Sequence, residues 1–283
     1  MRDIRELRND PAAYASELQR RWGGLLSYRY IGRKYDSMDT GPVDSTVTLR
    51  HDMRNTTGGL LVAPLSISSP EGAVGSDRET VPNPVIHSCQ ILDRAVDVKR
   101  IEVVESESLH LGTRMGYSRS KIVDADNRSR VIAFTEGQGA KIGEVPEGLE
   151  KMPPNPLEIV DSPDLPPLWQ VFGAFQRGDG HWALPELVVE LASPDAALHI
   201  GPQHVLLETA ATDLATELVG TDRLQITAWH VMFLARGKVG PFRVDGEPVR
   251  GAGNKVAVRL TLHDEGNQDR NVTAASALFE LVA

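Results

Sequence analysis

The stretch that decides the fold runs from Ala197 to Val219 and reads ALHIGPQHVLLETAATDLATELV. Gly201 and Pro202 stand where a chain turns into a helix, and the apolar residues that follow recur at helical spacings (Val205, Leu206, Ala210, Leu214, Ala215 and Leu218). This spacing predicts one long helix with a buried face. Glu208 lies beside that face, and Thr212 follows one turn later on the same side. A carboxylate next to a buried face must be paired, shifted in pKa or used in chemistry.

The composition predicts an ordinary soluble globular protein. The chain has 283 residues, of which 41% are hydrophobic and 24% charged, enough for one large or two small domains. A net charge of -9 argues against nucleic acid or an anionic membrane as the main partner. Cys89 is the single cysteine, so no intrachain disulfide is possible, and we expect a cytoplasmic setting. The N-terminal residues do not resemble a signal peptide, and no apolar run is long enough for a membrane span.

The first half of the sequence indicates a helix and several strands. A helix is expected over 12–22, ending at Gly23-Gly24, and a second over 60–67, where Pro64 must lie early or cause a kink. Alternation of apolar and polar residues indicates strands in the other segments (25–35, 45–51, 85–104, 109–123 and 130–142), with a turn at 124–127 and an exposed loop over 68–84.

The second half repeats this order after a proline-rich linker over 143–167. Strands are expected on both sides of the long helix, in five segments (186–192, 225–234, 239–244, 255–263 and 272–282), with a turn at 264–267. Thr57-Gly58-Gly59 in the first half corresponds in position to His199-Ile200-Gly201 in the second. The segments 131–133 and 272–274 correspond at nearly the same offset along the chain. These landmarks indicate a duplication, with chance alignment of short turns as the alternative. The expected boundaries are an N-terminal helix 1–24, a first unit 25–142, the linker, and a second unit 168–283.

The order His199, Gly201, Glu208, Thr212 resembles the His-Gly-Gly, acid, hydroxyl pattern of the hotdog-fold acyl-CoA thioesterases. The nearest likeness is to the 4-hydroxybenzoyl-CoA and PaaI-like branch, although Ile200 replaces the first glycine. The resemblance implies an α+β fold of two tandem hotdog units, each an antiparallel sheet wrapped around a central helix.

The resemblance also implies a site shared between the two units, with one unit giving backbone N–H donors and the other an acid. The first unit keeps Gly58 and Gly59 but has Ser66 at the acid position, whereas the second unit keeps Glu208 and Thr212. One site per chain is therefore expected. In it, the glycine N–H groups hold the thioester oxygen, Glu208 activates water or attacks the carbonyl, and Thr212 positions the water.

Four further residues are expected to contact substrate by the same resemblance: Asn55, Thr57, His199 and Gly201. For two of them the sequence leaves a purely structural role open. Asn55 can stabilise its own loop through an Asx turn, and His199 can cap the helix or lie in the core.

The expected function is hydrolysis of an acyl-CoA thioester, without a metal or other cofactor. Two alternatives stay open. Pro202, Leu206, Leu207 and Glu208 also resemble the helix start of hotdog acyl dehydratases and hydratases, but the catalytic histidine of those enzymes falls on Pro194 here. The other alternative is a non-catalytic acyl-binding or lipid-binding protein. The expected partner is an acyl-CoA, with no nucleic acid and no membrane, and the protein is either a monomer of two units or a homo-oligomer.

Overall fold

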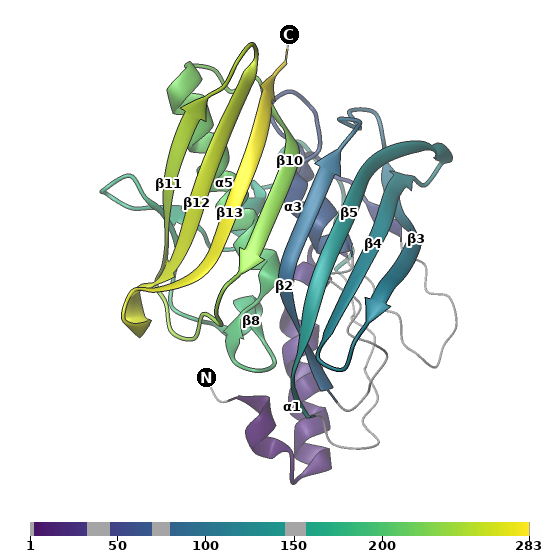
Figure 1. Ribbon diagram of the computed structural model, residues 1–283, viewed down its shortest axis with the longest axis vertical. Coiled ribbons are helices and arrows are strands. Elements are labelled where there is room, and N and C mark those ends of the chain that lie inside the picture. Colours follow the sequence, from purple (N-terminus) through teal and green to yellow (C-terminus); the bar gives the residue numbers. More distant parts are fainter. Residues whose placement is uncertain (1–2, 33–45, 70–79, 145–156, 283) are drawn as a thin grey trace.

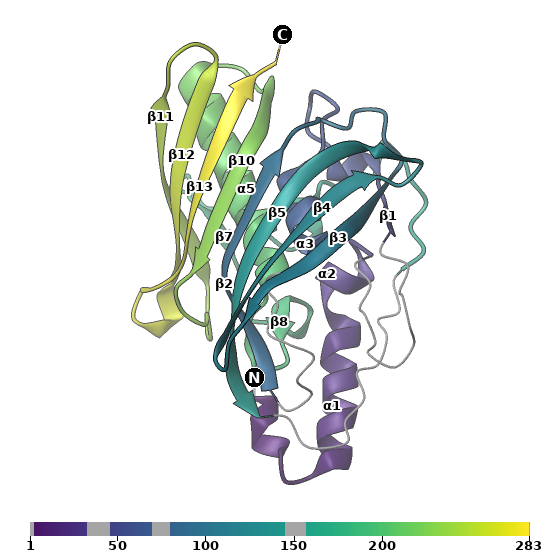
Figure 2. The same cartoon turned by 45° about the vertical axis from the view of Figure 1, so that its right-hand side comes forward.

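The computed structural model describes residues 3–32, 46–69, 80–144 and 157–282. Eleven strands form one sheet in the order β1-β3-β4-β5-β2-β10-β13-β12-β11-β7-β6, and the central helices α3 and α5 lie on one side of it (Figures 1 and 2). The first half of the sheet contains β1 (Thr46–Thr48), β2 (Thr80–Ile91), β3 (Arg100–Leu111), β4 (Met115–Asp124) and β5 (Asn127–Glu144). The second half contains β6 (Phe175–Gln176), β7 (Trp182–Leu184), β10 (Leu224–Phe233), β11 (Phe242–Arg250), β12 (Lys255–Asp264) and β13 (Arg270–Leu281).

The remaining elements are short apart from α1 and α5. The helices are α1 (Pro11–Gly24), α2 (Leu26–Arg29), α3 (Val62–Ser68), α4 (Leu168–Val171) and α5 (Ile200–Val219). Four 3₁₀ turns cover Ile4–Leu7, His51–Met53, Val189–Leu191 and Glu265–Asn267, and β8 (Ala192–Ser193) pairs with β9 (Ala197–Leu198). Within the described ranges, we find no helix with the length and apolar character needed to cross a membrane.

The long helix α5 confirms the prediction from its apolar spacing, with a later start. Ala197 and Leu198 pair with β8, so the helix begins at Ile200, with His199 as its N-cap. It ends at Val219, and the C-cap residue Gly220 has a φ of 74°, the left-handed conformation that glycine adopts most easily. Its buried face packs against β11, β12 and α3, so it lies on the second half of the sheet beside the other central helix.

The short helix α3 lies over the first half of the sheet. Pro64 is its third residue, where the missing N–H removes no intrahelical bond, so the expected helix forms without a kink. Both α3 and the expected turn at 124–127 are confirmed, since Asp124 pairs with Asn127 where β4 turns into β5.

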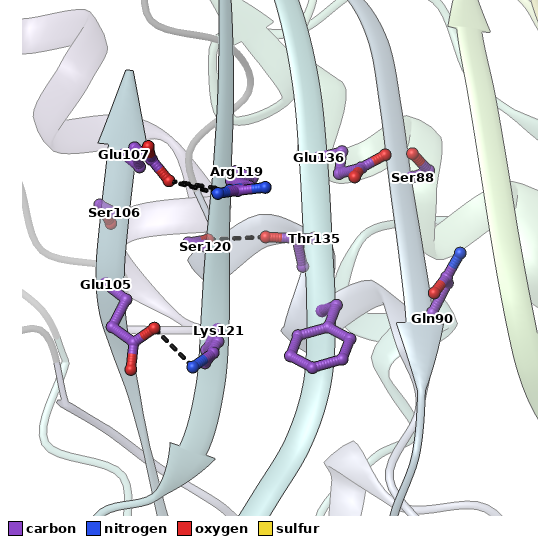
Figure 3. Close-up of a pocket in the computed structure, with 11 residues that line it drawn as sticks. Ser88, Gln90, Glu105, Ser106, Glu107, Arg119, Ser120, Lys121, Thr135 and Glu136 are labelled. Atoms are coloured by element: carbon purple, nitrogen blue, oxygen red, sulfur yellow. Dashed lines mark hydrogen bonds and ion pairs between the residues drawn. The ribbon is translucent and has the colours of Figure 1, made fainter. Parts of the chain in front are cut away.

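The two halves join where β2 and β10 pair as antiparallel strands, without a register shift. His230 pairs with Ser88 at the centre of this contact. On either side, Arg119 pairs with Glu107 at 2.8 Å, and Arg259 pairs with Glu247 at 2.7 Å. Figure 3 shows the first of these ion pairs, and the second recurs at the equivalent sheet positions of the other half. Because the same pair lies at matched places in both halves, the structure supports the duplication.

Several expected strands are wrong in type or extent. The segment 109–123 contains the end of β3, a turn and most of β4, and the segment 45–51 contains only the short strand β1. The segment 25–35 contains the helix α2 instead of a strand, because Ser27 and Tyr28 are buried beside the start of α5, while 33–35 lies outside the described residues. The segment 186–192 forms mainly the 3₁₀ turn Val189–Leu191. The segment 85–104 spans two strands, β2 and β3.

Strand β2 also begins within the segment expected to be a loop. Pro82 and Pro84 lie at the end of β2 that pairs with β5 alone, since β10 pairs only with residues 86–90, and the pairing with β5 shifts register beside both prolines. Strand β11 starts at Phe242, later than expected, and continues to Arg250. The three strands expected over 225–234, 255–263 and 272–282 are confirmed as β10, β12 and β13.

Candidate functional site

Glu208 is the buried carboxylate at the contact between the two central helices. Its side chain comes from α5, and the residue is only 5% exposed. One carboxylate oxygen accepts a hydrogen bond from the Val62 N–H at 2.7 Å, and the other accepts from the Ala63 N–H, also at 2.7 Å. The acid of the second half therefore meets backbone donors of the first half.

These donors are available because of how α3 begins. The first N–H groups of a helix have no carbonyl partner within it. The Leu61 N–H donates to the Met53 carbonyl at 3.0 Å, and Pro64 has no N–H to satisfy. The two N–H groups that remain, on Val62 and Ala63, both donate to Glu208. The carboxylate thus completes the hydrogen bonding of the first turn of α3.

Burial controls the ionisation of this site. It raises the pKa of Glu208 from 4.5 to about 7, against the two backbone hydrogen bonds, which lower it. The carboxyl therefore changes its charge near neutral pH, where a general base is most effective. Burial, with a smaller contribution from the Glu208 charge, raises the pKa of the Cys89 thiol to about 12, so Cys89 stays protonated.

The glycines before α3 are not the donors that meet Glu208, which corrects the prediction for Gly58 and Gly59. The Gly58 N–H donates to the Asn55 carbonyl at 2.9 Å, and the Gly59 N–H donates to Asn55 Oδ1 at 3.0 Å. Gly58 has a φ of 79°, which suits glycine in this tight turn. The donors lie three to four residues later in the chain, at Val62 and Ala63, because the helix begins only there.

Asn55 and Thr57 hold this loop together. Asn55 Oδ1 accepts from the Thr57 N–H at 2.9 Å and from Thr57 Oγ1 at 2.7 Å. Arg94 donates to both the carbonyl and the hydroxyl of Thr57. The polar groups of these two side chains are therefore used within the protein, which supports the loop-stabilising alternative for Asn55 over contact with substrate.

Residues of α2 cover the start of α5, so His199 and Gly201 contact protein groups there in place of the expected substrate. His199 Nδ1 accepts from the Gly201 N–H at 3.3 Å and lies 3.1 Å from Ser27 Oγ. A Cβ atom on residue 201 would lie only 1.8 Å from that same Ser27 oxygen, so any larger residue would have to displace the Ser27 side chain. The Tyr28 ring packs beside His199, with 5.7 Å between ring centroids. The helix-capping alternative for His199 is the one that the structure supports.

A separate hollow lies on the outer face of the first half of the sheet, and Glu208 is not among its lining residues (Figure 3). Its volume is about 540 Å³. The cations in it are paired, since Lys121 contacts Glu105 at 2.5 Å and Arg119 contacts Glu107 at 2.8 Å. The hollow thus has carboxylates beside its own cations, and none of its lining residues takes part in the contact between Glu208 and α3.

No protein-family model and no curated protein sequence matches the chain. Similar solved structures include the tesB protein of Mycobacterium avium subs paratuberculosis, with a TM-score of 0.56, 12% identity, and coverage of 87% of this chain and 97% of that one. They also include a protein of unknown function with a hot dog fold from Alicyclobacillus acidocaldarius, with a TM-score of 0.53, 12% identity, and coverage of 90% and 95%. The chain has a hotdog fold. A third similar structure is an acyl-CoA thioesterase II from Mycobacterium marinum, with a TM-score of 0.53, 15% identity, and coverage of 84% and 93%.

The hotdog fold accounts for the arrangement of the two halves. Each is a hotdog unit, an antiparallel sheet with a central helix, and the two units share one continuous sheet through β2 and β10. TM-scores of 0.53–0.56 show a shared fold, and identities of 12–15% leave the activity to be argued from the site. The finer assignment to the 4-hydroxybenzoyl-CoA branch stays a prediction.

The two hotdog units contribute unequally to the site. At the position in α3 that matches Glu208, Ser66 is fully buried, and its hydroxyl has no hydrogen-bond partner in the described part of the chain. Thr212 lies one turn after Glu208 on α5 and is partly exposed. Its expected role in placing water stays a prediction. Sequence reasoning placed Glu208 beside the buried face but missed its partners Val62 and Ala63, because their contact depends on where α3 begins. The catalytic role of Glu208 stays a prediction.

Proposed function

We propose that the chain hydrolyses the thioester bond of an acyl-CoA, with Glu208 as the general base. The observation that supports this function best is the bonding of the Glu208 carboxylate of one hotdog unit to the Val62 and Ala63 N–H groups of the other. The site thus combines a base that titrates near neutral pH with two fixed donors suited to a carbonyl oxygen.

In the proposed reaction, the thioester oxygen replaces the carboxylate on the two N–H groups. Water, which Thr212 positions, adds to the carbonyl carbon while its proton passes to Glu208. The C–S bond then breaks, and the departing thiolate receives that proton from Glu208. The two N–H donors stabilise the negative charge that develops on the oxygen when water adds.

A non-catalytic acyl-binding role is the second candidate. Glu208 is only 5% exposed, and both of its oxygens are hydrogen bonded, an arrangement that also suits a structural contact between the units. In that case Glu208 would hold α3 against α5, and the protein would bind acyl-CoA without consuming it.

The experiment is thiol release from a panel of short, long, aromatic and polycyclic acyl-CoAs. We expect wild type to release thiol and Glu208→Gln to lose on the order of a hundredfold or more in kcat. Ser66→Ala is the matched control, because it alters the equivalent buried position of the other unit and should retain activity. Thiol release by Glu208→Gln at the wild-type rate contradicts the proposal. Acyl-CoA binding without thiol release would favour the acyl-binding role, and an absorbance change on an enoyl-CoA alone would indicate a hydratase.

A further inference from the structure

Gln225 of the second hotdog unit reaches into the loop that precedes α3 in the first unit. The residue is on β10 and is only 3% exposed. Its Nε2 donates to the Leu60 carbonyl at 3.1 Å and to the Ile226 carbonyl at 3.1 Å. Its Oε1 accepts from Asn55 Nδ2 at 2.9 Å. The whole side-chain amide is therefore used, and two of its three hydrogen bonds cross between the units.

Gly59 makes room for this side chain. A Cβ atom on residue 59 would lie 2.0 Å from Gln225 Oε1, so no other residue fits without displacing the amide. Asn55 Nδ2 also donates to the Leu224 carbonyl at 3.1 Å, which ties the same loop to the start of β10. The glycine is thus explained by close approach of Gln225 and not by a donor role.

The chain between Gln225 and the two donors is short and fixed on both sides. The Leu60 carbonyl that Gln225 binds lies two residues before Val62. The Leu60 N–H donates to the Arg94 carbonyl at 2.9 Å, and the Leu61 N–H donates to the Met53 carbonyl at 3.0 Å. Arg94 and Met53 belong to the first unit. Gln225 is the residue that bonds this loop to the second unit, which carries Glu208.

We propose that Gln225 is a positioning residue that holds the loop before α3 so that the Val62 and Ala63 N–H groups face Glu208. The loss of kcat expected without Gln225 rests on the proposed thioesterase function, whereas the expected change in the Glu208 pKa does not. A loop that is free to move by about 1 Å would misplace both donors at once.

The test compares Gln225→Leu with Gln203→Leu. Gln203 is also a buried glutamine of the second unit, but it binds Thr273 and the Leu198 carbonyl, within its own unit. We expect Gln225→Leu to lower kcat on the order of a hundredfold with little change in KM, since donors that act on the transition state are misplaced. It should also raise the pKa of Glu208, measured by NMR of labelled glutamate, above the native value of about 7. Gln203→Leu should change neither quantity.

The two readouts separate this inference from the proposed function. If wild type releases no thiol, the thioesterase proposal fails, and the Glu208 pKa still decides the role of Gln225. A folded Gln225→Leu protein with an unchanged Glu208 pKa overturns the inference. If that variant does not fold, Gly59→Ala provides the second test, because it displaces the Gln225 amide and should raise the same pKa. An unchanged pKa in Gly59→Ala would equally overturn it.

Discussion

Replacing Glu208 by glutamine tests whether a carboxyl group is buried between the two hotdog units. Burial raises the pKa of Glu208 from 4.5 to about 7 in the folded protein. In the unfolded chain the pKa keeps its ordinary value, so the unfolded state loses this proton first as the pH rises. The protonated carboxyl therefore stabilises the fold fully below pH 4.5, and this stabilisation is lost as the pH rises through about 7.

The difference between the two pKa values corresponds to about 3 kcal/mol of unfolding free energy, because each pH unit of difference is worth about 1.4 kcal/mol. Glutamine has no such proton, so the Glu208→Gln variant lacks this pH dependence. The variant also turns an NH₂ group toward one backbone N–H, which costs about 1–3 kcal/mol at every pH. The stability advantage of wild type over the variant should therefore shrink by about 3 kcal/mol from acid to mildly alkaline pH.

The assay is denaturant unfolding of wild type and Glu208→Gln at several pH values from about 5 to about 8, comparing the free energies of unfolding. Glu247→Gln is the control, because Glu247 is an exposed carboxylate paired with Arg259. Its difference from wild type should stay nearly constant over this range, since exposed pairs contribute little. A constant difference for Glu208→Gln as well would refute the reasoning, because Glu208 would then have the same pKa in both states.

The same contacts lead to three other predictions. As the pH rises through about 7, kcat/KM for thioester hydrolysis should increase, because the base must be ionised; a flat pH profile contradicts Glu208 as the base. Gly201→Ala should lower the free energy of unfolding by about 1–3 kcal/mol, because its Cβ would lie 1.8 Å from Ser27 Oγ, and adding Ser27→Ala should restore part of the loss. Thermal unfolding of the single and double variants tests this, and equal stability of Gly201→Ala and wild type would contradict it. Cys89 should react with Ellman's reagent only after unfolding, because it is fully buried and has a pKa of about 12; rapid reaction of the native protein would show that the site is open.

Local sequence patterns predicted the helix and strands that have one buried and one exposed face. The apolar spacing from Val205 to Leu218 was enough for α5, because one face of that helix packs against the sheet and α3. Alternation was enough for β10, β12 and β13. The segment around Ser27 failed because its helical conformation depends on packing against the start of α5, which no local pattern encodes.

The sequence by itself determined the long helix and the carboxylate of Glu208 beside its buried face, because both follow from apolar spacing along one helix. The hotdog arrangement was implied by the resemblance of this helix and its flanking strands to the hotdog thioesterases. Only the tertiary structure decided which groups meet that carboxylate. The Val62 and Ala63 N–H groups lie about 145 residues away in the chain, and they become donors because α3 begins at Val62 and points toward α5. Backbone N–H groups are identical in every residue except proline, so their role is fixed by where a helix starts and what it faces, not by the side chains that a sequence displays.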